Sequence, residues 1–107
     1  MTLEVVFDAN VFFRSLISGG EILKLLFNNK LRLFAPLKLR EEFINNKDKI
    51  LSKSKLSNIE FNRLAFLLFK KITFVPLDKY KSFIPRAKRL LDKHEKDEDF
   101  VALCLSK

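Results

Sequence analysis

The stretch Leu3-Glu4-Val5-Val6-Phe7-Asp8-Ala9-Asn10 is the most informative part of this chain for its fold. Residues 3–7 are a short, mostly apolar run, which predicts a strand buried on both faces, as in a parallel sheet. The run ends in Asp8-Ala9-Asn10, and both Asp and Asn favour turns and helix caps. The sequence therefore predicts a strand that leads directly into a helix.

Asp8 follows this strand at its carboxyl end, where open α/β sheets place their functional sites. One interpretation makes Asp8 a ligand of a hard cation, with Asn10 orienting it by a hydrogen bond. The other makes Asp8 the cap of a helix that begins at Val11. Position alone favours the two interpretations equally.

The remaining chain alternates between short strands and pairs of helices. Gly19 and Gly20 end the first helix, Pro36 suits the first turn of the third, and Ser57 with Glu60 has the form of a capping box. Pro85 predicts a break, with a new helix that carries it in its first turn. We expect strands at residues 3–7, 31–34 and 72–75, and helices at 11–17, 21–27, 37–52, 57–71, 78–92 (in two pieces) and 97–106. This order predicts an α/β fold with helices on both faces of a short parallel sheet.

Length and composition limit the class of protein. The 107 residues fit a single domain over 1–107, and 48% hydrophobic residues exclude a disordered chain. The one cysteine, Cys104, excludes a disulfide framework, and its apolar surroundings predict packing in the core. No apolar run reaches membrane-spanning length and no signal peptide is recognisable, so we expect a cytoplasmic protein with no membrane partner.

The chain carries a formal net charge of +8, which is compatible with a polyanionic partner such as RNA. The residues Arg86, Lys88, Arg89 and Lys93 precede an acidic segment and are candidates for holding a phosphate backbone. A solvated basic helix face explains them about equally well. The apolar stretch at 64–69 suggests burial at a subunit interface as well as in the core.

Acidic residues gather at the starts of predicted elements despite the positive net charge. The Glu41-Glu42 pair follows the second strand, and Asp97-Glu98-Asp99 opens the last helix. Favourable interaction with helix dipoles explains each group by itself. Together with Asp8, they would lie at one edge of the sheet, where convergent carboxylates can bind a divalent cation that promotes phosphodiester hydrolysis.

These residues also carry a resemblance to a known family. The segment Val6-Phe7-Asp8-Ala9-Asn10-Val11-Phe12, then Glu42 after a strand and Pro36, then Asp97-Glu98-Asp99-Phe100-Val101-Ala102-Leu103-Cys104-Leu105 resemble the PIN domain, in particular its small prokaryotic, largely archaeal, members. The resemblance runs from the first strand to the last helix. It implies a three-layer α/β/α fold.

The resemblance further implies a metal-dependent ribonuclease that hydrolyses RNA. Asp8, Glu42 and Asp97 would be the catalytic metal ligands, Asp99 a further acidic ligand, and Asn10 a supporting residue. The implied cofactor is Mg²⁺ or Mn²⁺. Many members are VapC-type toxins, which implies an antitoxin protein as a partner, and a homodimer or higher oligomer is expected.

One departure from the family pattern shapes a second hypothesis. In the family, another strand and a fourth acidic residue follow the last matching helix, and this sequence ends at Ser106-Lys107. We therefore expect an open sheet edge beside the first strand, which oligomerisation could cover. The alternative function is a catalytically impaired PIN-like module that acts by self-association or by binding a protein or nucleic acid.

Overall fold

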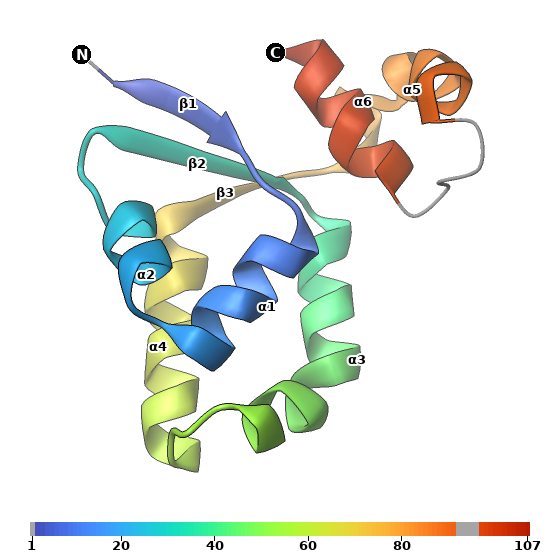
Figure 1. The fold of residues 1–107 in the computed structure, drawn as a ribbon. Helices are drawn as coiled ribbons and strands as arrows, with labels where there is room; N and C mark the ends of the chain where they lie inside the picture. The colour runs from blue at the N-terminus through green and yellow to red at the C-terminus, as the bar shows by residue number, and fades with distance from the viewer. Residues whose placement is uncertain (1, 92–96) are drawn as a thin grey trace.

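The computed structural model describes residues 2–91 and 97–107 (Figure 1). The expected alternation of strands and helices is confirmed. The strands are β1 (Leu3–Val6), β2 (Leu31–Pro36) and β3 (Ile72–Val75). The α-helices are α1 (Ala9–Ser18), α2 (Glu21–Leu26), α3 (Lys38–Lys53), α4 (Asn58–Lys71), α5 (Ile84–Leu91) and α6 (Glu98–Ser106), and two short 3₁₀ helices, η1 (Leu77–Lys79) and η2 (Lys81–Phe83), lie between β3 and α5.

The three strands form a parallel sheet in the order β1-β2-β3. The register pairs Val5 with Leu33, and Leu33 with Ile72. Among the described residues β1 pairs with β2 alone, so it forms an edge of the sheet. The expectation that β1 is buried on both faces is wrong for its first half, since Leu3 is 60% exposed and Glu4 is also exposed. An edge strand is covered along one side only, and helices reach only its second half.

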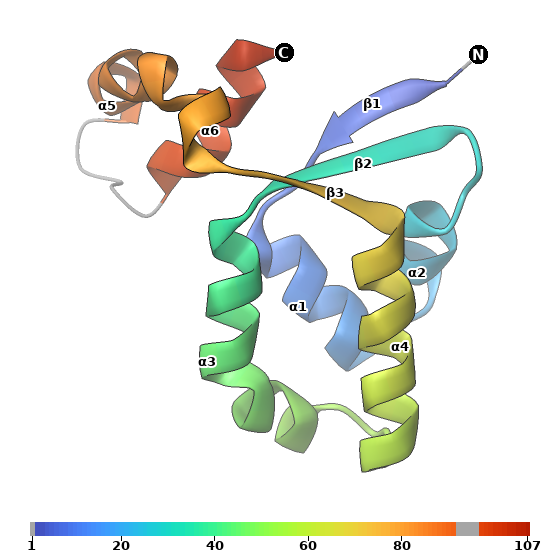
Figure 2. The same cartoon turned by 180° about the vertical axis from the view of Figure 1, so that it is seen from behind.

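Helices cover both faces of the sheet. Helices α1 to α4 lie on one face, and α5 and α6 lie on the other, near the carboxyl ends of the strands (Figures 1 and 2). Helix α6 packs against β1 and β2. This arrangement brings the beginning of α6 close to the ends of β1 and β2, although about 60 residues separate α6 from β2 along the chain.

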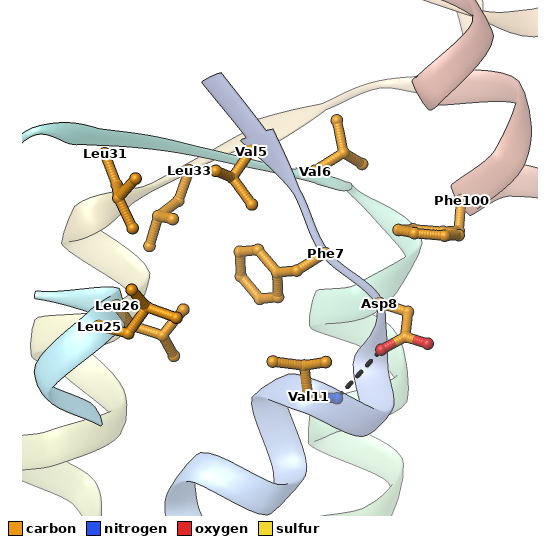
Figure 3. Close-up of a pocket in the computed structure, with 10 residues that line it drawn as sticks. All are labelled: Val5, Val6, Phe7, Asp8, Val11, Leu25, Leu26, Leu31, Leu33 and Phe100. Carbon is orange, nitrogen blue, oxygen red and sulfur yellow. Dashed lines mark hydrogen bonds between the residues drawn. The ribbon is translucent and has the colours of Figure 1, made fainter. Parts of the chain in front are cut away.

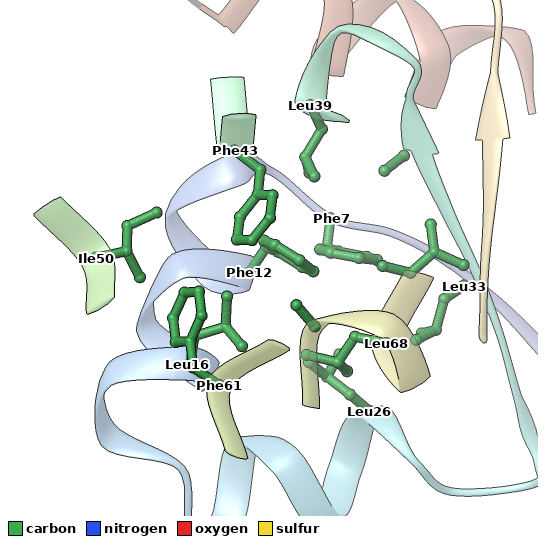
Figure 4. Packing of buried hydrophobic residues seen from close by; sticks show 13 residues of the cluster. Phe7, Phe12, Leu16, Leu26, Leu33, Leu39, Phe43, Ile50, Phe61 and Leu68 are labelled. Carbon is green, nitrogen blue, oxygen red and sulfur yellow. The ribbon is translucent and has the colours of Figure 1, made fainter. Parts of the chain in front are cut away.

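Two hydrophobic clusters hold these layers together. The larger lies between the sheet and α1 to α4, and Phe12, Phe43 and Phe61 pack in series within it (Figure 4). Phe12 also stacks on Phe69. The smaller lies on the opposite face and consists of Tyr80, Ala87, Ala102 and Leu103, with Val6 and Val75 packed against it. Successive strand residues serve the two clusters because side chains alternate across a sheet: Val5 joins the larger cluster and Val6 the smaller.

Local sequence signals at several helix ends are confirmed. Ser57 and Glu60 form a reciprocal capping box at the start of α4. Pro85 is the second residue of α5, where its missing N–H leaves no intrahelical bond unmade. Gly19 and Gly20 have φ values of 62° and 64°, and they connect α1 to α2 through a backbone conformation that glycine adopts without steric cost.

Two expectations about single residues are wrong. Pro36 is the last residue of β2 rather than part of a helix, and α3 begins at Lys38. A proline fits there because the next donor, the Leu37 N–H, makes the hydrogen bond to the Val75 carbonyl at 2.9 Å. Cys104 is exposed and lies outside the core, because α6 presents Ala102 and Leu103 to the smaller cluster instead.

Candidate functional site

Asp8 has the capping role that its position suggested. It is the N-cap of α1, and its Oδ1 accepts a hydrogen bond from the Val11 N–H at 3.0 Å (Figure 3). This bond fixes the orientation of the carboxylate at the carboxyl end of β1. Figure 3 also shows the ring of Phe100, from α6, beside Asp8. The helix-cap interpretation is therefore confirmed, and the capping carboxylate lies close to α6.

Glu42 lies on α3, just after β2 ends, and its side chain is half-buried. The pKa of its carboxyl is raised above the ordinary value, first because burial disfavours the charged form. The negative charges of Asp99 and Asp8 raise this pKa further, while the positive charge of Lys38 lowers it. Glu42 thus lies within the electrostatic influence of two other carboxylates and one ammonium group.

Asp99 lies in the first turn of α6, and both of its oxygens have partners. Its Oδ2 accepts a hydrogen bond from the Tyr80 hydroxyl at 2.5 Å, and its Oδ1 lies 3.8 Å from the Lys38 ammonium. The pKa of Tyr80 is raised well above its ordinary value, first by burial and then by its hydrogen bond to Asp99 and the charge of that residue.

We call the three carboxylates of Asp8, Glu42 and Asp99 the acidic cluster, and the Lys38 ammonium lies beside it. Its members come from the end of β1, the beginning of α3 and the beginning of α6. Their placement agrees with the general rule that open α/β sheets carry their sites at the carboxyl ends of the strands.

Two other acidic residues predicted at this edge lie differently. Asp97 is the N-cap residue of α6, its side chain makes no capping hydrogen bond, and it is not among the charges that act on Glu42. Glu41 is exposed to solvent. The acid of the last helix that acts on Glu42 is therefore Asp99 rather than Asp97.

The predicted supporting and basic residues that the structure describes are at the protein surface. Asn10 is exposed, and the described part of the chain shows no hydrogen bond from it to Asp8. Arg86, Lys88 and Arg89 are exposed on α5, and the Lys88 ammonium lies 3.9 Å from Glu98 on α6. Lys93 lies outside the described residues. The basic face of α5 therefore lies next to the helix that carries Asp99.

The donor set fits a hard divalent cation by its chemistry. Its charged groups are carboxylates, whose oxygens Mg²⁺ and Mn²⁺ prefer, and their mutual repulsion would be relieved by a positive ion. The carboxylates are farther apart than the ligands of a bound metal ion would be. Within residues 2–91 and 97–107, no group of three or more acidic, His or Cys side chains is close enough together to hold one. The Lys38 ammonium supplies the positive charge beside Asp99 in this arrangement.

Lys38 and Tyr80 are not predicted by the sequence patterns above. Lys38 precedes Glu42 by one helical turn, so the spacing of four residues on one helix face could have indicated it. Tyr80 and Asp99 are 19 residues apart in the sequence, with α5 between them, and no local pattern connects the two. A contact of that kind depends on how α6 docks on the sheet.

An apolar pocket of about 390 Å³ lies next to Asp8 (Figure 3). It is lined by side chains of β1, α1, α2 and β2 and the turn after β1, and by Phe100 of α6, and Asp8 is the only charged residue among the described residues of its wall. Its lining offers a single carboxylate and no basic group, so it is unsuited to a phosphate.

Fold and site together define an α/β protein with a carboxylate cluster at the carboxyl edge of a parallel sheet. The sequence matches the PIN domain family over residues 6–107, and the chain belongs to this family. No curated protein matches the chain, and no solved structure matches it. Family membership indicates a nuclease-like function, and PIN domains are generally dependent on divalent metals. None of the helices in the described part of the chain is long and apolar enough to cross a membrane.

Proposed function

We propose that this protein is a divalent-metal-dependent ribonuclease that hydrolyses phosphodiester bonds of RNA. The observation that carries the proposal is the convergence of Asp8, Glu42 and Asp99 from three separate elements onto one edge of the sheet. Membership of the PIN domain family and the net charge of +8 support it. Carboxylates repel RNA phosphates unless they bind a cation. A group of carboxylates in a basic protein is therefore expected where a bound cation contacts the phosphate and basic side chains bind the rest of the backbone.

In this proposal the three carboxylates of the acidic cluster, Asp8, Glu42 and Asp99, hold Mg²⁺ or Mn²⁺. Asp97, the N-cap residue of α6, contributes a further carboxylate. When bound, such a cation lowers the pKa of a water molecule and stabilises negative charge on phosphate oxygens. The hydrogen bond from the Val11 N–H keeps the Asp8 carboxylate in a fixed orientation. Arg86 and Arg89, together with Lys88 and Lys93, bind the RNA backbone, and Asn10, two residues after Asp8, has a supporting role.

The direct test is cleavage of single-stranded RNA with and without Mg²⁺ or Mn²⁺. We expect metal-dependent cleavage that Asp8→Asn reduces at least about 100-fold, since even loss of groups that only orient metal ligands costs about 10- to 100-fold. Asparagine retains the ability to cap α1, so the fold is preserved. Asp48→Asn, an exposed position on α3, is the matched control and should cleave normally. Absence of metal-dependent cleavage by the wild-type chain would refute the proposal.

A finer proposal is that the ribonuclease acts as a toxin with an antitoxin protein as its partner. The support for this is its family membership, since nuclease activity on cellular RNA is the property a toxin of this kind requires. Induced expression in a bacterial host should arrest growth, and expression of Asp8→Asn should not. Equal growth with both chains would contradict this role.

A second candidate function is association without cleavage. The observation that favours it is the exposed apolar surface of α4, where Ile59, Phe66 and Leu67 are 72%, 61% and 46% exposed. A homodimer or higher oligomer formed through α4 would bury these side chains. Light scattering should then show a multimer that Phe66→Lys converts to monomer, and a strictly monomeric wild-type chain would exclude this function.

A further inference from the structure

Tyr80 is a buried residue that neither the family pattern nor the proposed metal ligands include. Its side chain is 1% exposed and belongs to the smaller hydrophobic cluster, where Ala87, Ala102 and Leu103 surround it. Its hydroxyl donates to Asp99 Oδ2 across a sequence separation of 19 residues. Packing therefore fixes the ring, and the ring fixes the position of the donor that holds Asp99.

The other partner of Asp99 holds it less firmly. The Lys38 ammonium is 3.8 Å from Asp99 Oδ1, and the side chain of Lys38 is 49% exposed. Ion pairs at such exposed positions contribute little, because water screens the charges and a long side chain loses conformational freedom. A short hydrogen bond from a buried hydroxyl to a carboxylate is stronger and more directional. The orientation of Asp99 thus depends mainly on Tyr80.

We propose that Tyr80 is a positioning residue of the acidic cluster: its hydroxyl holds the Asp99 carboxylate at the edge of the sheet, where it can act with Glu42 and Asp8 on a divalent cation. This inference rests on the proposed metal-dependent function and extends it to a residue that does not touch the metal or the RNA. Because the Tyr80 hydroxyl holds Oδ2, a cation would bind Asp99 through Oδ1, in place of the Lys38 ammonium.

The test is the affinity of Tyr80→Phe for Mn²⁺, measured by calorimetry. Phenylalanine preserves the packed ring and removes only the donor, so far-ultraviolet circular dichroism should be unchanged. We expect binding about 10- to 100-fold weaker than wild type, as is typical when a group that orients a metal ligand is lost. Metal affinity, and not melting temperature, is the readout, because a purely structural hydroxyl would change only the latter.

Ser15→Ala is the matched control. Ser15 is fully buried, and its hydroxyl donates to the Phe12 carbonyl at 2.6 Å within α1, away from the acidic cluster. Its removal deletes a buried hydroxyl as Tyr80→Phe does, and we expect Mn²⁺ affinity to remain that of the wild type. Equal weakening in both variants would attribute the effect to general loosening of the fold and overturn the inference.

Asp99→Asn completes the design. If Tyr80 acts through Asp99, Tyr80→Phe should weaken Mn²⁺ binding in the wild-type background but change it little in the Asp99→Asn background. Independent, additive losses would contradict the inference. Should Tyr80→Phe not fold, Asp99→Asn alone decides, because unchanged affinity would show that Asp99 takes no part in the site.

The outcomes separate this inference from the proposed function. If the wild type and Tyr80→Phe bind Mn²⁺ equally, the metal site stands and the role of Tyr80 is wrong. If the wild type binds neither Mn²⁺ nor Mg²⁺, the proposed metal-dependent function is wrong, and the positioning role is wrong with it.

Discussion

At the scale of single residues, the negative charge of Glu42 is unfavourable in the folded protein. Burial and the carboxylates of Asp99 and Asp8 raise its pKa, and Lys38 only partly opposes them. Ionised Glu42 therefore makes the folded state less stable than a neutral side chain would. Such local conflict is typical of a functional site, where a ligand and not the fold completes the charge balance.

Glu42→Gln should consequently stabilise the protein at neutral pH. With its pKa raised on folding, Glu42 holds more protons in the folded state than in the unfolded state at pH values between its ordinary 4.5 and the raised value. Stability falls as pH rises through this window, and the loss is complete above it. The variant should therefore melt above the wild type at pH 7 and with it at pH 4. A lower melting temperature at pH 7 would contradict this account.

Lys38 should compete with a divalent cation, because its ammonium already neutralises part of the acidic cluster. Lys38→Met retains the aliphatic chain and removes the charge. We expect Mn²⁺ affinity to rise about fivefold, the upper range for a partly exposed charge pair. Lys49→Met, an exposed position about three turns further along α3, serves as the control and should leave the affinity unchanged. Weaker binding by Lys38→Met would show that Lys38 supports the site.

At the scale of elements, the helix signals that predict the fold are local. The capping box at Ser57 and Glu60 joins residues three apart, and its Ser57 Oγ accepts from the Glu60 N–H at 3.2 Å. Ser57→Ala should reduce the free energy of unfolding by about 1 kcal/mol, as measured by urea denaturation. Ser52→Ala, which removes an exposed hydroxyl within α3, should change it by less than about 0.5 kcal/mol. Equal effects would indicate that the cap contributes nothing specific.

What sequence could not predict depends on contacts between elements. Asp8 was predictable because a strand end and a helix start are both written in adjacent residues. The burial of β1 was not, since it depends on which neighbours the strand acquires in the sheet. The pairing of Tyr80 with Asp99 was not either, because it requires α6 to dock beside β1 and β2. The sequence therefore predicted which acidic residues lie at the site, but not the residues that contact them.

At the scale of the whole molecule, Phe12 is a central residue of the larger hydrophobic cluster. It is completely buried, and its ring packs against Phe43 of α3 and Phe69 of α4. Phe12→Ala should destabilise the protein by about 3–5 kcal/mol, a large share of the roughly 5–15 kcal/mol expected in total. Ile44→Ala truncates an apolar residue that is 67% exposed on α3 and should cost less than about 0.5 kcal/mol. Denaturant unfolding of both variants tests this, and comparable losses would contradict the assigned core.

The acidic cluster lies at the boundary between the two hydrophobic clusters, because its residues come from elements that belong to both. Asp8 and Glu42 each adjoin a phenylalanine of the larger cluster, whereas Tyr80 and the helix of Asp99 belong to the smaller one. A unit with few buried side chains opens more readily than the rest of a protein. Amide protons of α5 and α6 should thus exchange with deuterium faster than those of α1 and α4, and a bound cation should slow them. When α5 and α6 detach from the sheet, Asp99 would leave the acidic cluster while the larger hydrophobic cluster stays intact. When they dock again, the acidic cluster would re-form.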